Sequence, residues 1–168
     1  MERTRGFIGL VILSILAMIY RLQQVFFQKV SALHLQQTGD GEIDRLILES
    51  QEFALNQAKF YQNNINKWLT ILLVLVLISV LFCYLKGKIL QAKWLYLSYI
   101  VGQFLHAMYR FVGFKMIVNS INFEEVRQFT VAATNFKFYG SIVLFVVYTA
   151  IILISLYRDT ERGKVSFV

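Results

Sequence analysis

The sequence contains no proline and only one cysteine among its 168 residues. Without proline, nothing locks φ or removes a backbone donor inside a helix, so long uninterrupted helices are expected. The single cysteine, Cys83, excludes an intramolecular disulfide, a CxxC redox pair and a thiolate metal cluster. Thiol–disulfide oxidoreductases of the four-helix membrane type are therefore excluded as a function class.

Motifs that carry catalysis or bind cofactors are also missing. There is no Gly-rich phosphate loop, HExxH or GxSxG. The segment DGEID at 40–44 resembles the start of an EF-hand loop, but Arg45 stands where that loop needs glycine and Gln51 where it needs glutamate. The two histidines, His34 and His106, are predicted at different depths, which argues against a bis-histidine haem. We expect no enzyme activity, no metal and no other cofactor.

Acidic residues are scarce, with ten Asp and Glu against 17 Lys and Arg and a formal charge of +7. The basic residues flank apolar stretches and form no dense stripe, so a nucleic-acid partner is not expected. Hydrophobic residues make up 57% of the chain, and the mean hydropathy of +0.56 exceeds what one soluble core requires. The composition predicts an integral membrane protein in contact with the lipid bilayer.

Four apolar stretches are long enough to cross a hydrocarbon layer of about 30 Å, which takes roughly 20 residues in a helix. They cover about residues 6–27, 68–86, 94–114 and 136–157. Aromatic residues such as Trp68 and Trp94 lie near their ends, where amphipathic rings favour the headgroup layer. The first stretch lacks a small-residue cleavage site, and we interpret it as a retained anchor. Residues 1–168 are expected to form a single four-transmembrane domain.

The distribution of positive charge predicts the orientation. Eight of the 17 Lys and Arg fall in three short segments, at 1–5, 86–93 and 158–168. Cytoplasmic segments of membrane proteins are enriched in Lys and Arg, so both termini and the middle link are predicted to face the cytoplasm. The expected location is the plasma membrane or the bacterial inner membrane.

Residues 28–67 form the largest region predicted outside the membrane. Within TGDGE, at 38–42, the glycines permit a turn and Asp40 is a predicted N-cap. Apolar residues then recur at spacings of three and four, so the helix is expected to run straight into the second span. The predicted fold class is all-α: an integral membrane four-helix bundle with an extracytoplasmic helical hairpin between spans one and two. A separate amphipathic helix, capped at Asn122, is predicted for 122–133.

A polar stripe runs along the third span. Its residues are four, three and four positions apart, which places them on one helix face: Tyr99, Gln103, His106 and Arg110. Polar groups are costly against acyl chains, so this face should point into the bundle or toward a partner. Three interpretations are open: a purely structural stripe, a site for an anionic lipid or other ligand, and a path for protons or ions.

Arg110 needs a neutralising partner, because all ten acidic residues lie outside the four predicted spans. The alternatives are an ion pair with Glu124 or Glu125 of the next connection, a lipid phosphate, or snorkelling of the arginine to the headgroups. Arg21 and Tyr139 are expected at a similar depth in other spans. The predicted ligand- or lipid-binding residues are Gln103, His106, Arg110, Arg21 and Tyr139.

Small residues on two spans permit close approach of another helix. Gly102 and Gly113 lie on the third span, and Gly6 and Gly9 on the first. They serve either packing inside the bundle or a dimer seam. Cys83, near the cytoplasmic end of span two, is either a buried apolar thiol or a palmitoylation site.

Two function classes remain. The favoured one is a noncatalytic multi-pass membrane protein that acts through assembly with its own copies or other membrane subunits, as an accessory or structural subunit or a small oligomeric pore. The alternative is a membrane-embedded binder, transporter or enzyme that uses the face of His106 and Arg110 for a lipid or amphipathic ligand. Assembly should be lost when an exposed helix face is altered, whereas the activity of a binder or enzyme should be lost when Arg110 alone is changed.

Overall fold

The computed structural model describes residues 2–27 and 39–165. Every regular element within these ranges is helical, and none is a strand. The elements are α1 (Glu2–Leu22), the π-helical η1 (Gln23–Phe27), α2 (Gly41–Tyr61), α3 (Asn64–Leu85), α4 (Ile89–Val118) and α5 (Glu124–Val165). The all-α prediction is confirmed.

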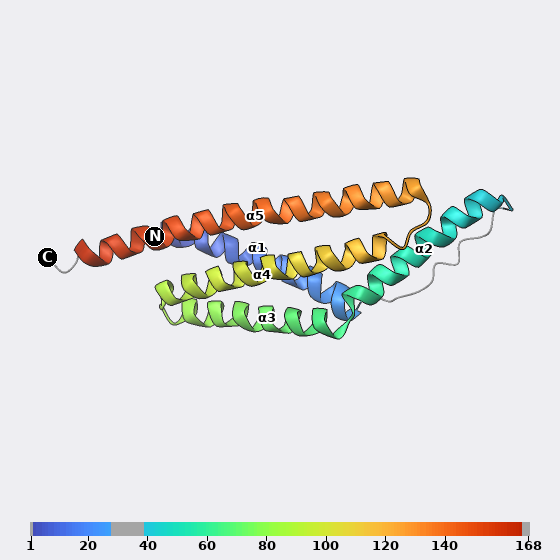
Figure 1. The fold of residues 1–168 in the computed structure, drawn as a ribbon. Helices are drawn as coiled ribbons and strands as arrows, with labels where there is room; N and C mark the ends of the chain where they lie inside the picture. Colours follow the sequence, from blue (N-terminus) through green and yellow to red (C-terminus); the bar gives the residue numbers. More distant parts are fainter. Residues whose placement is uncertain (1, 28–38, 166–168) are drawn as a thin grey trace.

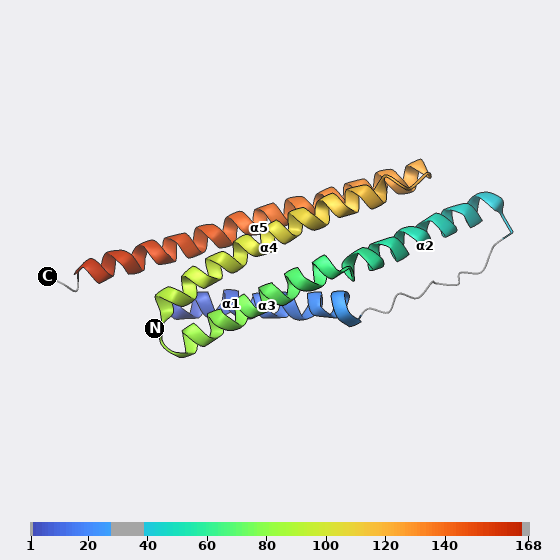
Figure 2. The same ribbon diagram turned by 60° about the horizontal axis from the view of Figure 1, so that its bottom comes forward.

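The long helices form an elongated bundle with α4 at its centre. α3 and α5 pack on opposite sides of α4, and α1 crosses the bundle at an angle to α5 (Figures 1 and 2). The start of α1, the α3–α4 link and the end of α5 lie at one end. The α4–α5 link lies at the opposite end, and α2 extends α3 beyond it (Figure 1). The segments predicted to share one side of a membrane therefore share one end of the bundle.

Three helical stretches are long and apolar enough to cross a membrane, as judged over the described residues: Gly6–Phe27, Asn64–Leu85 and Glu124–Thr160. Most side chains in their most apolar parts lie on the outside of the bundle, as lipid-facing surfaces do. α4 is long enough but less apolar, because Gln103, His106 and Arg110 fall in its middle. Its role as a fourth span stays a prediction.

α5 is longer than the predicted span at 136–157. Its 42 residues, at 1.5 Å per residue, measure about 63 Å, roughly twice the hydrocarbon thickness. The separate helix predicted for 122–133 is wrong, since the chain is helical without a break from Glu124 onward. No proline or glycine lies between Glu124 and Tyr139 to interrupt it. Just before its first turn, the Phe123 N–H donates to Glu49 Oε2 at 2.8 Å, which ties this end to α2.

The N-cap predicted at Asp40 is present, with Asp40 Oδ1 accepting from the Glu42 N–H at 3.0 Å. The helix does not continue into the second span as expected. α2 ends at Tyr61 and α3 begins at Asn64, with Asn63 as its N-cap. Residues 28–38, which include one arm of the predicted hairpin, lie outside the described residues, so the hairpin itself stays a prediction.

Glycines on α4 allow close packing inside the bundle. A Cβ on Gly102 would lie 2.9 Å from Leu73 Cδ2 of α3, and a Cβ on Gly113 would collide with the Phe60 ring of α2. Gly6 and Gly9 have no neighbour within 4 Å of such a Cβ. The α4 glycines therefore serve internal packing. Cys83 is half-buried against the core.

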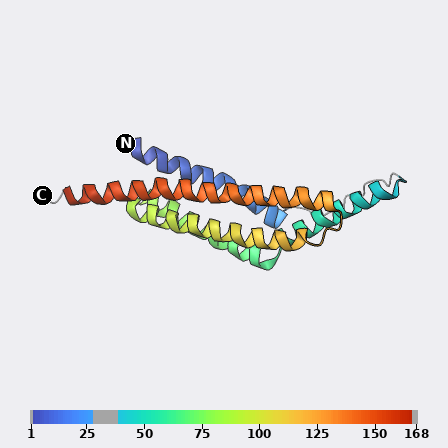
Figure 3. The ribbon, with the colours of Figure 1, turned by 45° about the horizontal axis from the view of Figure 1, so that its top comes forward.

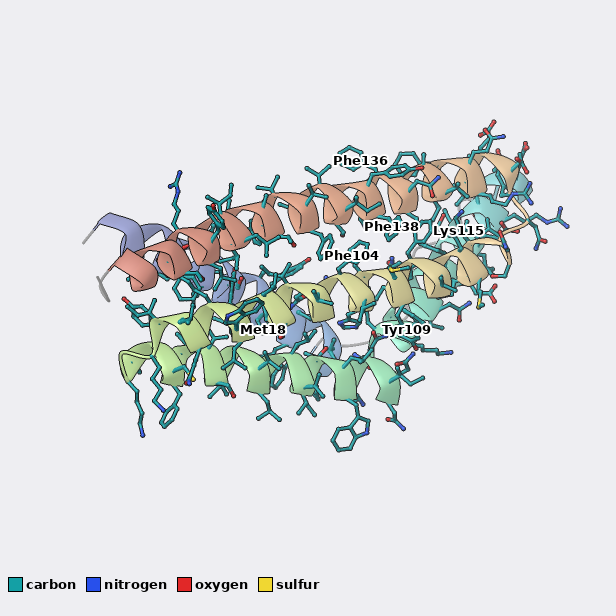
Figure 4. The ribbon with its side chains drawn as sticks, turned by 60° about the vertical axis from the view of Figure 1, so that its left-hand side comes forward. Met18, Phe104, Tyr109, Lys115, Phe136 and Phe138 are labelled. Carbon is teal, nitrogen blue, oxygen red and sulfur yellow. The ribbon has the colours of Figure 1, made fainter. Side chains whose placement is uncertain are left out.

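Stacked aromatic rings join α4 to α5. The ring centroids of Phe104 and Phe145 are 4.4 Å apart, and those of Phe111 and Phe138 are 4.1 Å apart. Figure 4 shows Phe104 and Phe138 between the two helices, whereas Phe136 points away from the bundle. The stacks hold α5 against α4, and they leave the opposite face of α5 outward.

Candidate functional site

The polar stripe of α4 faces the bundle interior and binds a side chain of α1. Arg21 Nη1 donates to Gln103 Oε1 at 2.5 Å, and Gln103 Nε2 donates to the Tyr99 hydroxyl at 2.7 Å. The same Arg21 nitrogen lies 3.2 Å from His106 Nδ1. An α1 side chain is thus held by two positions of the stripe, and we call Arg21, Gln103, His106 and Arg110 the arginine site.

The hydrogen bonds of His106 define its state. An arginine can only donate, so His106 Nδ1 accepts from Arg21 and carries no proton. The proton is then on Nε2, which donates to Asn66 Oδ1 at 2.7 Å. His106 is 2% exposed and is a neutral connector between α1 and α3. A neutral imidazole supplies no charge to balance Arg21.

The break between α2 and α3 positions Asn66. Asn63 Oδ1 accepts the Asn66 N–H at 2.7 Å and so starts α3. The Asn66 amide then donates from Nδ2 to the Phe60 carbonyl at 2.6 Å, which leaves its oxygen for His106. Asn63 Nδ2 also donates to the Tyr109 hydroxyl at 3.1 Å. The helix break and the polar stripe therefore form one connected network.

Arg110 has a neutral partner, the Tyr61 side chain at the end of α2. Burial raises the pKa of the Tyr61 hydroxyl above its usual value, and the positive charge of Arg110 opposes that rise. Arg110 Nε is buried and has no hydrogen-bond partner. A guanidinium N–H without an acceptor is costly in an apolar interior, so this donor favours an added acceptor.

No carboxylate neutralises the two arginines within the part of the chain that the structure describes. Glu124, one of the predicted partners of Arg110, is paired with Arg127 and accepts from Gln128. Arg21 and Arg110 line the same cavity, so their like charges repel each other. The arginine site is therefore a buried concentration of positive charge.

Two cavities meet at Arg110. The middle cavity, of about 220 Å³, lies between α1, α4 and α5 and is lined by Arg21 and Gln103 together with apolar side chains. The end cavity, of about 280 Å³, lies nearer the α4–α5 link and is lined by Tyr61 and Lys137 among others. Both cavities share the side chains of Ala107, Arg110 and Ser141. Arg110 thus lies in a wall common to both.

Four of the five predicted site residues come together. Arg21, Gln103 and His106 are joined by hydrogen bonds, and Arg110 lines the middle cavity beside Arg21 and Gln103. Tyr139 does not join them, because it is 63% exposed on the outer face of α5. Its neighbour two positions along, Ser141, lines both cavities instead.

Three residues around the arginine site are absent from the five predicted site residues: Asn66, Tyr61 and Ser141. Asn66 had a detectable signal, because the paired asparagines at 63–64 are typical of a helix start, and a new start places Asn66 in the first turn of α3. Tyr61 and Ser141 carried no comparable local signal, since their roles depend on which face each helix turns toward α4.

A second buried polar cluster lies at the opposite end of the bundle. Lys93 of α4 is 4% exposed and donates from Nζ to Asp159 Oδ2 at 2.6 Å and to Ser155 Oγ at 2.7 Å, both on α5. From its place in the sequence, Lys93 was predicted only to be one of the charges that set the topology. Here a carboxylate balances the buried cation.

Residues 7–164 match the family described as a domain of unknown function (DUF8777). The chain belongs to this family. No curated protein and no solved structure matches it. The family description assigns no ligand and no reaction.

The arginine site is suited to bind an anion. A guanidinium presents paired N–H donors that match phosphate or carboxylate oxygens, and the guanidinium groups of Arg21 and Arg110 belong to residues that line one cavity. Among the described residues, no group of three or more His, Cys, Asp or Glu could hold a metal ion.

Proposed function

We propose that the protein is a noncatalytic multi-pass membrane protein that binds an anionic amphiphile at the arginine site, through the phosphate or carboxylate of the ligand. One observation carries this proposal: Arg110, whose buried Nε has no acceptor, lines the wall shared by two cavities, one of which Arg21 also lines, and no described carboxylate balances the two charges. An anion bound against Arg110 would accept from its guanidinium and offset the repulsion between the two guanidinium groups.

The proposal includes four membrane spans, with α4 as the third in chain order. α4 lies between α3 and α5, both of which are apolar enough to span, and its polar stripe is covered by α1 and α3 (Figure 2). Both termini and the α3–α4 link are assigned to the cytoplasm, and residues 28–67 to the other side, as a hairpin. The membrane is the plasma membrane or the bacterial inner membrane. An accessibility tag at residue 40 that reacts only from the cytoplasm would contradict this orientation.

Replacing Arg110 by Leu tests the binding proposal. Thermal unfolding is measured in neutral detergent with and without phosphatidylglycerol, a lipid with one phosphate charge. The wild type should gain about 2.7 kcal/mol when lipid is present at 100 times its dissociation constant. Arg110→Leu should lose most of this gain. It should still insert into the membrane, because the substitution only removes the insertion cost of an arginine, which is about 2.5–3.5 kcal/mol even at mid-membrane.

Arg45→Leu is the matched control, since it removes the same charge from an exposed position on α2. It should respond to the lipid as the wild type does. If Arg110→Leu behaves like the wild type in both conditions, the arginine only snorkels and the site has no ligand.

Assembly is a second candidate function, favoured by the outer face of α5. Just 11% of the most apolar window of α5 is buried, and Phe129 is 76% exposed beyond the predicted span at 136–157, where lipid does not cover it. A second copy or another membrane subunit would bury this ring. Phe129→Ser should then reduce the mass of the detergent-extracted particle. A wild-type particle that contains a single 19.6 kDa chain and no partner would contradict assembly.

A further inference from the structure

We infer that the anionic ligand reaches the arginine site sideways from the bilayer, through an opening between α1 and α5, and that it is a phospholipid whose acyl chain occupies the middle cavity. This inference rests on the proposed function and adds the class of the ligand, its source and its orientation.

The middle cavity opens on the side where α1 and α5 face each other. Leu13 of α1 and Leu144 of α5 line the cavity, yet they are 54% and 56% exposed, and Ala17 of α1 is exposed as well. A side chain that lines a cavity and is also half exposed lies at its rim. All three residues fall within stretches apolar enough to span a membrane. Outside this rim, the surroundings are therefore acyl chains rather than water.

The hydrogen bonds of α1 explain why the rim lies there. The Tyr96 hydroxyl of α4 donates to the Leu10 carbonyl at 3.1 Å and lies 2.8 Å from Ser14 Oγ. Arg21 makes the next contact with α4, at Gln103. These bonds hold α1 to α4 along one face, about two helical turns apart. Figure 3 shows α1 crossing α5 at an angle, and Figure 1 shows the C-terminal end of α1 lying farther from α5 than its N-terminal end.

The lining changes from apolar to basic along α5, as an amphiphile requires. Phe145 and Leu144 line the middle cavity, Ser141 belongs to both cavities, and Lys137 lines the end cavity. From Tyr148 to Lys137 is eleven residues, or about 16 Å of helix. The stacked rings of Phe104 and Phe145 offer an apolar wall to a chain. A phosphate at Arg110 and a chain against these rings would satisfy both halves of the lining.

Phosphate is the shared chemistry of a lipid headgroup and a soluble phosphate ester, so the experiment compares the two. The full chain in neutral detergent is titrated with phosphatidylglycerol, with glycerol phosphate and with phosphatidylcholine, and the thermal midpoint is recorded. Leu144→Trp narrows the opening. Val143→Trp is the matched control, since the adjacent Val143 is 59% exposed and is not part of the cavity lining. Ala17→Leu is a milder change at the opposite rim.

The inference predicts that phosphatidylglycerol stabilises the wild type and Val143→Trp equally. For Leu144→Trp the lipid concentration at half effect should rise at least tenfold, and for Ala17→Leu it should rise severalfold. Both rim variants should keep the wild-type midpoint without lipid. Glycerol phosphate and phosphatidylcholine should have little effect on any variant.

The outcomes separate this inference from the proposed function. Equal stabilisation by glycerol phosphate and phosphatidylglycerol, lost in Arg110→Leu, would overturn the lipid route and retain anion binding. If the phosphatidylglycerol concentration at half effect is the same for Leu144→Trp, Ala17→Leu and Val143→Trp, the proposed opening between α1 and α5 is overturned. If neither phosphatidylglycerol nor glycerol phosphate stabilises the wild type, the proposed function itself is overturned.

Discussion

The two ends of the bundle bury positive charge in opposite ways. At the end that holds the α3–α4 link, Lys93 is paired with the carboxylate of Asp159 and with Ser155. At the other end, the described partners are neutral: Gln103 and His106 for Arg21, and Tyr61 for Arg110. Among the described residues, a carboxylate pairs with the buried cation at one end, and none pairs with the arginines at the other. Under the proposed function, an exchangeable anion would take the place that the Asp159 carboxylate has at the Lys93 end.

The largest expected effect comes from breaking the ion pair between Lys93 and Asp159. Asp159→Ala leaves the buried Lys93 ammonium with Ser155 as its one described partner. Breaking a buried pair costs about 3–5 kcal/mol, and the 34% exposure of Asp159 places the expected loss near the lower end, about 3 kcal/mol. Chemical unfolding in detergent measures it.

A paired change sharpens this prediction. Lys93→Met with Asp159→Leu removes both charges and should recover most of the lost stability, because an apolar pair of similar volume needs no charge balance. Glu125→Ala, at an exposed position, is the control and should be nearly neutral. A loss below about 0.5 kcal/mol for Asp159→Ala would mean that the pair behaves as a surface salt bridge.

The second largest effect is expected from a substitution that gives the arginines a carboxylate, as Asp159 gives one to Lys93. Ser141→Asp places a carboxylate in the wall that both cavities share with Arg110. The protein without lipid should become more stable, and the gain from phosphatidylglycerol should fall by about 2 kcal/mol, since the site then holds its own anion. Thermal midpoints with and without lipid measure both changes.

Ser141→Asn is the control, with nearly the same shape and no charge. Its lipid response should stay close to that of the wild type. If Ser141→Asp keeps the full response to phosphatidylglycerol, the lipid does not bind at Arg110, and the contrast between the two ends has no functional meaning.

The smallest effect is expected at His106, the neutral residue that connects α1 to α3. His106→Leu leaves Asn66 Oδ1 without its His106 donor, while Arg21 keeps its bond to Gln103, so the loss should be about 1 kcal/mol. His106→Gln keeps an amide donor and an acceptor and should cost less than about 1 kcal/mol. Differential unfolding of the two variants tests this. Equal losses would show that His106 matters for its volume rather than for its hydrogen bonds.

Patterns of near neighbours in the sequence were sufficient for much of the fold. The apolar stretches, the absence of proline and the cap at Asp40 predict helices because each depends on residues within one or two turns. The stripe of Gln103, His106 and Arg110 followed from helical spacing in the same way. Its inward direction followed from the cost of polar groups in lipid.

The tertiary structure decided which groups meet. The bond between His106 and Asn66, the pair of Lys93 and Asp159, and the outward position of Tyr139 depend on how each helix is rotated about its axis. Residues one or two positions apart point in quite different directions on a helix, so Ser141 reaches the cavities and Tyr139 does not. The sequence by itself determined that Arg110 belongs to a polar helix face that avoids acyl chains. Only packing between distant segments decided that no described carboxylate reaches Arg21 or Arg110 and that Arg110 lines two cavities.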